Sequence, residues 1–223
     1  MDSFASIFQR ACERKGGEAE LQALLSEPLG AQALQRMPDD RYLAEMTRCV
    51  FRSGFVWKII ENKWPGFEKV FHQFDVTSCA LMSEEEQELA ATDERIVRNA
   101  TKIRSVPRNA AFIRAVREDS GSFGSYLAAW PDDDFVGLWD ELKRHGDRLG
   151  GQTGRFFLRF VGKDTPLMSQ DVVDALINQG VVDKAPTGKK ALAAVQDAFR
   201  DWQQESGRPF CQISRVLSCS VGD

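Results

Sequence analysis

The sequence contains few of the residues that bind metals or form disulfides. Only two histidines, His72 and His145, occur among its 223 residues. The five cysteines are scattered along the chain without a Cys-x-x-Cys pair, a usage typical of a reducing compartment. We therefore expect no zinc site, no disulfide framework and no cofactor, and we interpret the cysteines as small buried hydrophobic residues.

Long apolar segments are also missing. No stretch approaches the roughly 18 uninterrupted apolar residues of a membrane-spanning helix, and the opening MDSFASIFQRACERK reaches Asp2 and Arg10 too early for a secretory signal. Alternating β-branched runs are almost absent, whereas helix-capping residues recur. These features predict a globular, all-α protein in the cytoplasm, without a membrane partner.

Charge is unevenly distributed, although the net charge is only −4. The segment from Arg95 to Arg117 contains seven basic residues, Lys102 among them, and no acidic one. The segment from Lys143 to Lys163 contains six more, with Asp147 as its only acidic residue. Because a bound polyanion responds to the local field, these segments favour an anion-binding face. Solvated helix faces are the alternative.

Helix periodicity and capping residues divide most of the chain into helices. We predict helices over about 41–53 and over FVWKIIENK, a turn at Pro65 and Gly66, and a helix capped by Ser83. Further helices are predicted over about 95–104, 108–118, 121–129, 135–145, from Ser169 to Gly180, from Thr187 to Gly207, and over RPFCQISRVLSCS. There is no internal repeat or linker, so we expect one domain over 1–223, with room for two lobes around a cleft.

A glycine-rich corner, RLGGQTGRFF at 148–157, joins two of these helices. It fits neither GxxxxGK[ST] nor GxGxxG, which leaves a helix hairpin at about 146–156. Glycines allow a ligand close to the backbone, and the start of the second helix offers N–H groups and a partial positive charge. We predict a phosphate-binding site here, with a plain hairpin turn as the alternative. Its candidate DNA-contacting residues are Gly150, Gly151, Gln152, Thr153, Gly154 and Arg155, with Lys102 added from the other basic segment.

The sequence LGGQTGRFFLRFVGKDTPLMSQDVV resembles the helix-hairpin-helix element of base-excision DNA glycosylases. Upstream, CVFRSGFVWKIIENKWPGFEKVFHQFD, ERIVRNATKIRSVPRNAAFI and GSFGSYLAAW resemble the DNA-3-methyladenine glycosylase I family in order and spacing. The resemblance covers about residues 43–180. It implies an all-α helix-hairpin-helix glycosylase fold, a DNA-facing cleft and a monofunctional hydrolase that removes an alkylated base.

The chain departs from this family at two places. It has no Cys-x-Trp opening, and the family's later His-x-x-x-Cys ligands correspond to Asp171 and Ala175, so the resemblance implies a member without zinc. The family's pocket glutamate corresponds to Cys49, and Glu45 is the nearest carboxylate, one helical turn earlier. The superfamily's catalytic aspartate falls on Ser169 by ungapped counting, or on Asp171 if the loop is two residues longer.

The resemblance also gives roles to individual residues. Trp57 corresponds to the pocket tryptophan that stacks on a flipped base, and Phe55 is a candidate helper. Cys49 could contact a base edge, while Asp171 and Glu45 are the candidate catalytic carboxylates that would steady the sugar cation. The alternative is structural: core aromatics for Trp57 and Phe55, a buried thiol for Cys49, and helix-dipole stabilisation for Asp171.

Two hypotheses about function remain open. In the first, the protein is a monomeric DNA repair glycosylase that excises an alkylated, 3-methyladenine-like, or otherwise damaged base from double-stranded DNA. In the second, it is a non-catalytic relative that binds DNA or lesions through the same hairpin. The absence of the matched glutamate and zinc ligands favours the second, whereas both need Trp57 and the hairpin.

Overall fold

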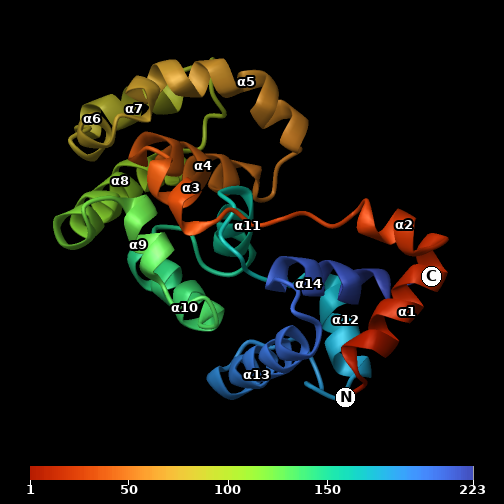
Figure 1. The fold of residues 1–223 in the computed structure, drawn as a ribbon. Coiled ribbons are helices and arrows are strands. Elements are labelled where there is room, and N and C mark those ends of the chain that lie inside the picture. The colour runs from red at the N-terminus through yellow and green to blue at the C-terminus, as the bar shows by residue number, and fades with distance from the viewer. Residues whose placement is uncertain (223) are drawn as a thin grey trace. The chain divides into compact units, whose positions relative to one another are not determined.

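A computed structural model describes residues 1–222; Asp223, the last residue of the predicted domain, lies outside the described residues. Within that range the chain forms fourteen α-helices and one short 3-10 helix and contains no strand. The prediction of an all-α fold is confirmed. The helices group into two compact units, which are described separately (Figure 1).

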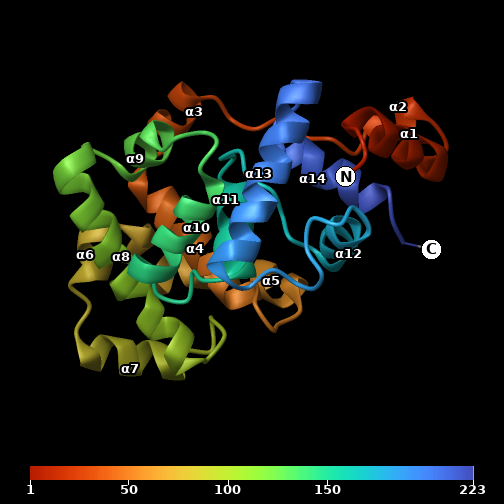
Figure 2. The same ribbon diagram turned by 90° about the horizontal axis from the view of Figure 1, so that it is seen from below.

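The first unit contains residues 1–29, 131–138 and the described chain from Gly162 onward. Its core is α14, in which eight of ten residues are buried, and α1, α12 and α13 pack against it (Figure 2). The Asp164 carboxylate caps α14 by accepting hydrogen bonds from the N–H groups of Phe210 and Cys211, at 2.9 and 2.8 Å. Its helices are α1 (Phe4–Lys15), α2 (Glu18–Gln22), α12 (Gln170–Asn178), α13 (Lys189–Ser206) and α14 (Phe210–Cys219).

The second unit contains residues 30–130 and 139–161. Its central helix, α4, buries nine of fourteen residues and packs against α5, α8, α9 and α11. Its elements are α3 (Ala31–Arg36), α4 (Asp39–Arg52), α5 (Trp57–Val70), the 3-10 helix η1 (His72–Phe74), α6 (Val76–Ala80), α7 (Glu84–Thr92), α8 (Ala100–Ser120), α9 (Phe123–Ala129) and α11 (Gln152–Phe160). Helix α10 (Phe135–His145) begins in the first unit and ends in the second.

Several predicted helix ends are confirmed, because side chains satisfy the free backbone N–H groups there. Ser83 forms a capping box with Glu86 at the start of α7. Ser169 accepts a hydrogen bond from the N–H of Val172 and caps α12. Gly207, at φ +67°, ends α13 in the left-handed conformation that favours glycine.

The two internal prolines led to wrong predictions. Pro65 and Gly66 form no turn but lie within the continuous helix α5. Pro107 likewise lies inside α8, which replaces the two helices predicted over 95–104 and 108–118. A proline removes one hydrogen bond from a helix, but each of these helices has buried residues on both sides of its proline. Tertiary packing therefore outweighs the local preference.

The predicted start of α13 was also wrong, by one residue. The helix begins at Lys189, and its N-cap is Gly188 rather than a residue with a capping hydroxyl. The predicted opening residue, Thr187, lies before the cap. Helices α1, α2, α3 and α6 were not predicted, and three of them have only five or six residues.

Gly66 has a packing role, because a Cβ atom there would lie 2.3 Å from the carbonyl oxygen of Arg95. We expect Gly66→Ala to lower the free energy of unfolding by about 1–3 kcal/mol, since overpacking against backbone outweighs the gain in helix propensity. Urea denaturation measures this change. Gly150→Ala is the control, because its Cβ would meet only the flexible Lys143 side chain at 3.2 Å; equal stability of the two variants would contradict the prediction.

Candidate functional site

The hairpin joins the end of α10 to the start of α11 within the second unit. Gly151 is the N-cap of α11, with φ +62° and ψ −136°, a conformation nearly restricted to glycine. It is exposed, and a Cβ there would meet nothing within 4 Å. No side chain caps this helix, whose first-turn N–H groups have no acceptor four residues earlier. The start of α11 thus has the backbone geometry and partial positive charge of an anion-binding site.

The other two glycines of the hairpin have different surroundings. Gly154 is buried, and a Cβ there would lie 2.1 Å from the carbonyl oxygen of Leu149. Gly150 packs against the Lys143 side chain. Gly154 therefore allows the turn to pack on its own helix, and only Gly151 presents bare, exposed backbone.

Arg155 does not extend freely from the hairpin as a surface basic residue would. Its guanidinium carbon lies 4.1 Å from the centre of the Trp139 ring on α10. Burial lowers the pKa of Arg155 to about 10, so the side chain still carries its charge at neutral pH. Its Nε atom is buried without a hydrogen-bond partner. We assign Arg155 to holding the two helices of the hairpin together by a cation–π contact.

Lys102 is also buried, with 5% of its surface exposed. Its Nζ atom donates to the carbonyl oxygens of Phe51, at 3.2 Å, and of Ser53. Burial, and to a lesser extent the charge of Arg148, lowers the pKa of Lys102. The side chain thus binds the carbonyl end of α4 and does not present its charge to an external phosphate, so we leave it out of the proposed DNA contacts.

A cavity of about 180 Å³ lies between the start of α11 and the end of α4. Trp57, 45% exposed, forms one wall. Its ring meets those of Phe156 and Phe160 edge-on, with centres 5.8 and 6.0 Å apart. The lining residues are Cys49, Arg52, Ser53, Gly54, Trp57, Gln152, Thr153, Phe156 and Phe160. The structure therefore brings Trp57, Cys49 and two residues of the predicted phosphate site to one cavity.

Glu45 does not line this cavity but contacts Cys49, which does. Its Oε1 atom accepts a hydrogen bond from the Cys49 thiol at 3.6 Å, and its Oε2 atom accepts one from Arg48 at 2.9 Å. Burial raises the pKa of Glu45, and the charges of Arg48 and Arg52 offset part of this rise. Burial, followed by the charge of Glu45, also raises the pKa of Cys49 and keeps it a neutral thiol. Glu45 thus reaches the cavity through Cys49.

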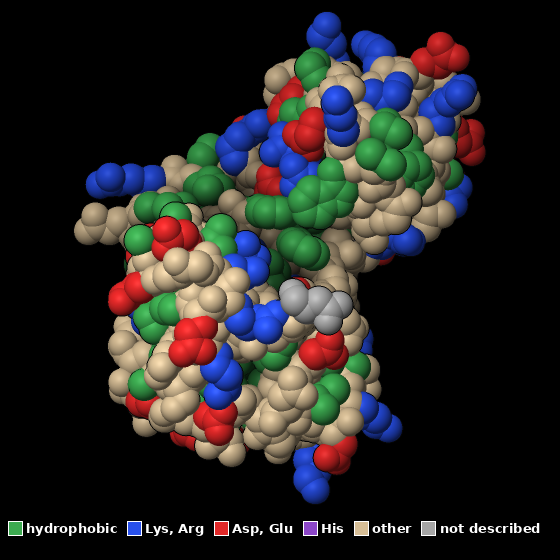
Figure 3. Space-filling model, turned by 90° about the vertical axis from the view of Figure 1, so that its right-hand side faces the viewer, with side chains coloured by type: hydrophobic (Ala, Val, Ile, Leu, Met, Phe, Trp, Pro, Cys, Tyr) green, Lys and Arg blue, Asp and Glu red, His purple; other side chains and the backbone are tan. Residues whose placement is uncertain are grey.

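Two other predicted residues lie outside the cavity. Phe55 packs on Lys102, whose Nζ atom is 4.5 Å from the ring centre, and lines a separate hollow with Ile59 and Ile96. Asp171 belongs to the first unit, where it is exposed in the first turn of α12. Figure 3 shows a face on which exposed hydrophobic side chains lie beside charges of both signs. The exposed large hydrophobic residues include Phe55, Val56, Trp57, Ile59 and Phe160.

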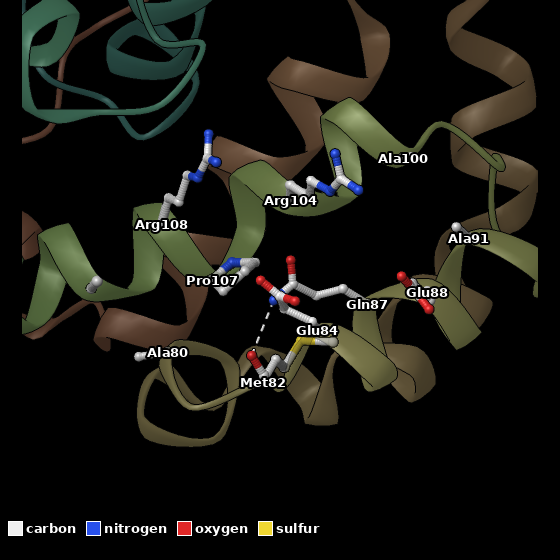
Figure 4. Close-up of a pocket in the computed structure, with 11 residues that line it drawn as sticks. Ala80, Met82, Glu84, Gln87, Glu88, Ala91, Ala100, Arg104, Pro107 and Arg108 are labelled. Atoms are coloured by element: carbon white, nitrogen blue, oxygen red, sulfur yellow. Dashed lines mark hydrogen bonds between the residues drawn. The ribbon is translucent and has the colours of Figure 1, made fainter.

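A larger cavity, of about 660 Å³, lies between parts of α7 and α8. Figure 4 shows Glu84, Gln87 and Glu88 on one side of it and Arg104, Pro107 and Arg108 on the other. It has no aromatic lining residue and shares none with the cavity beside the hairpin. It therefore lacks a surface on which a planar ring could stack, in spite of its size.

Five residues that line the smaller cavity were not predicted as site residues from the sequence: Arg52, Ser53, Gly54, Phe156 and Phe160. In the apolar run that follows the hairpin, Phe157 and Val161 are buried, whereas Phe160 is 43% exposed. Spacing by four residues places Phe156 and Phe160 on one face of α11, which was the available signal. No signal in the sequence indicated Arg52, because the placement of its side chain depends on Trp57 and Glu61 of α5.

Comparisons with known proteins identify the family of the chain. Residues 34–144 match the methyladenine glycosylase family model, and this segment contains α4, α5 and α8 together with Cys49 and Trp57. Through it, the chain belongs to the methyladenine glycosylase family. No curated protein sequence gives a significant match.

Solved structures show the same fold at low identity. A 3-methyladenine DNA glycosylase I from Staphylococcus aureus is 20% identical, with a TM-score of 0.52 over 65% of this chain and 84% of the other. A variant of 3-methyladenine DNA glycosylase I, solved with 3-methyladenine, is 20% identical, with a TM-score of 0.51 over 60% and 84%. The Methanocaldococcus jannaschii 8-oxoguanine glycosylase/lyase, solved with DNA containing 8-oxoguanine, is 14% identical, with a TM-score of 0.53 over 95% of both chains. The prediction of a helix-hairpin-helix glycosylase fold is confirmed.

The amide groups at the start of α11 can be tested one at a time. Gln152 is the first residue of this helix, a position where proline is well tolerated and removes only the N–H group. We expect Gln152→Pro to weaken binding of duplex DNA at least threefold, whereas Gln152→Ala retains the amide and binds like the wild type. Filter binding across a salt series measures both. Equal affinities of the two variants at low salt would remove this amide from the DNA contacts.

The prediction of a protein without zinc rests on its two histidines and the missing ligand spacing. In residues 1–222, no group of three His, Cys, Asp or Glu side chains is arranged to hold a metal ion. We expect protein purified without added metal to contain less than a tenth of an equivalent of zinc. Elemental analysis followed by a thermal melt with and without chelator tests this. Stoichiometric zinc whose removal lowers Tm would overturn it.

Proposed function

We propose that the protein is a monofunctional DNA glycosylase that excises an alkylated or otherwise damaged base flipped out of double-stranded DNA. The observation that carries the proposal is the shared cavity: Gln152 and Thr153 of the hairpin line the same space as Trp57 and Cys49. A phosphate-binding helix start thus adjoins a wall on which a base can stack. Membership of the methyladenine glycosylase family supports this reading.

Base flipping determines what the cavity must supply. A base inside a duplex cannot be reached, and extruding it costs a few kcal/mol. Stacking on Trp57 would return roughly 1–3 kcal/mol. A volume of about 180 Å³ is below the roughly 300–1,000 Å³ of sites for drug-sized ligands and is suited to a single base.

Hydrolysis of the N-glycosidic bond needs a water molecule and a carboxylate near the developing sugar cation. We propose Glu45 and Asp171 as the two candidates. Glu45 is held behind Cys49 at the cavity, and Asp171 stands at the start of a helix that follows the hairpin in the chain. DNA would be held by the exposed backbone at Gly151 and the first turn of α11.

A second candidate function is binding of DNA or lesions without catalysis. It is favoured by one observation: among the described residues that line the cavity there is no carboxylate. The hairpin and Trp57 would serve this function equally well. We propose that the protein acts on DNA as a monomer. Within residues 1–222, no helix is long and apolar enough to span a membrane.

Stacking acts only after the base has left the duplex. We therefore expect Trp57→Ala to reduce single-turnover excision at least tenfold while leaving affinity for undamaged duplex within twofold. Trp57→Phe keeps an aromatic ring and should lose less. Because Trp57 is half-exposed, both variants should fold. Loss of undamaged-duplex affinity equal to the loss of excision would contradict a role in stacking.

Isosteric substitution distinguishes the roles of Asp171 and Glu45, because it removes the charge of a carboxylate at nearly constant shape. We expect Asp171→Asn to slow the chemical step at least tenfold without weakening lesion binding. Single-turnover excision with parallel binding measurements on alkylated and deaminated substrates distinguishes the two effects. If Asp171→Asn is as fast as the wild type, Asp171 is excluded and Glu45→Gln becomes the test. If the wild type releases no base from any lesion, the binding function replaces the enzyme.

A further inference from the structure

A guanidinium group forms part of the wall of the small cavity. The Cζ atom of Arg52 lies 4.8 Å from the centre of the Trp57 ring and 5.2 Å from that of Phe160. Arg52 itself lines the cavity, and its side chain is only 16% exposed. A base that stacks on this aromatic wall would therefore lie beside a fixed positive charge.

Two carboxylates hold Arg52 in place from outside the cavity. Its Nη2 atom lies 2.8 Å from Oε1 of Glu61, and its Nη1 atom lies 3.8 Å from Oε1 of Glu45. Arg48 binds the same two carboxylates, at 2.9 Å from Glu45 and 3.8 Å from Glu61, and packs on Trp64. Of these four charged residues, only Arg52 lines the cavity. Neither carboxylate lines the cavity, so the guanidinium is the one charged group among the described residues of its wall.

The remaining polar groups of the cavity wall carry no negative charge. Cys49 is 4% exposed, and its thiol is kept neutral by burial and by the neighbouring Glu45. Ser53, Gln152 and Thr153 supply hydroxyl and amide groups. A base with a positive ring would meet a like charge and no carboxylate, whereas an uncharged base could offer an acceptor atom to the guanidinium N–H groups.

We propose that this cavity selects uncharged bases, such as deaminated or oxidised ones, and discriminates against cationic N-alkylated purines, with Arg52 as the residue that determines the selection. The proposal rests on the proposed function, because it takes the cavity as the seat of the flipped base.

An uncharged base is a poorer leaving group than a cationic one. Its departure therefore needs stabilisation of the negative charge that develops on it, which Arg52 would supply. When the C1′–N bond breaks, its electron pair stays on the base, which leaves as an anion. Water oxygen forms the new bond to C1′ and releases a proton, which neutralises the base through solvent. Negative charge that develops on the base would be stabilised by the adjacent guanidinium. The Arg52 guanidinium thus disfavours the binding of cationic bases and assists the departure of uncharged ones.

The test uses free base analogues and the full-length protein, so that it does not depend on catalysis. The probes are 9-methyladenine and 7-methyladenine, which are neutral, and 7,9-dimethyladeninium, which has both methyl groups and a positive charge. Isothermal titration calorimetry gives their Kd values. We expect the cation to bind at least tenfold more weakly than the better neutral probe. Equal or tighter binding of the cation, or binding of none of the three, would overturn the proposal.

Variants identify the residue responsible. Arg52→Gln should reduce the discrimination to less than threefold, and Arg52→Lys should keep it. Arg48→Gln is the matched control, because Arg48 shares both carboxylate partners but does not line the cavity; it should discriminate as the wild type does. A thermal melt of each variant verifies folding. If Arg52→Gln melts like the wild type and retains full discrimination, Arg52 is not the determinant.

A parallel excision assay separates this proposal from the proposed function. Duplexes carrying hypoxanthine or uracil are compared with duplexes carrying 7-methylguanine, in the wild type and in Arg52→Gln. Selective binding of neutral probes without excision of any base would refute the enzyme and retain the selection. Excision of 7-methylguanine in preference to neutral lesions, unchanged in Arg52→Gln, would refute the selection and retain the enzyme.

Discussion

The burial of α4 determines where the residues of the small cavity lie. This helix packs against α5, α8, α9 and α11, and its apolar residues, from Tyr42 to Phe51, are removed from solvent. Each fully buried side chain of this size contributes roughly 1.5–3 kcal/mol, so the helix has little freedom to rotate. Cys49 and Arg52 lie in the last turn of α4, and Trp57 is the first residue of α5. The packing of the core of the second unit therefore determines the shape of the cavity.

The hairpin depends on the same packing. Phe157 and Leu158 of α11 are buried, and α11 packs on α4, which fixes the direction in which the start of α11 points. Gly154 allows the turn to approach Leu149 closely, while the cation–π pair of Arg155 and Trp139 joins the two helices. A phosphate bound at the first turn would thus meet a backbone already in position, which reduces the entropy lost on binding.

Local signals in the sequence were sufficient for the fold class and for many helix ends. Ser83, Ser169 and Gly207 act through their own backbone neighbours, so their roles can be recognised without tertiary information. Pro65 and Pro107 could not be interpreted in this way, because the helices around them persist through contacts with distant segments. The cavity was predictable at Trp57 and Cys49 from the family resemblance. Lys102 and Arg155 were not predictable, since a long basic side chain can extend into solvent or lie along apolar surface, and only its neighbours decide which.

Lys102 restrains the backbone at the end of α4. Its ammonium group binds the backbone carbonyls of Phe51 and Ser53, where α4 ends and the segment that leads to Trp57 begins. Carbonyls at a helix end otherwise exchange hydrogen bonds with water, and the residues beyond them fray on the nanosecond timescale. With these carbonyls bound to Lys102, the backbone at the junction of α4 and the 53–56 segment is tied to α8, the helix that carries this lysine. The aromatic wall would then exist before any DNA arrives.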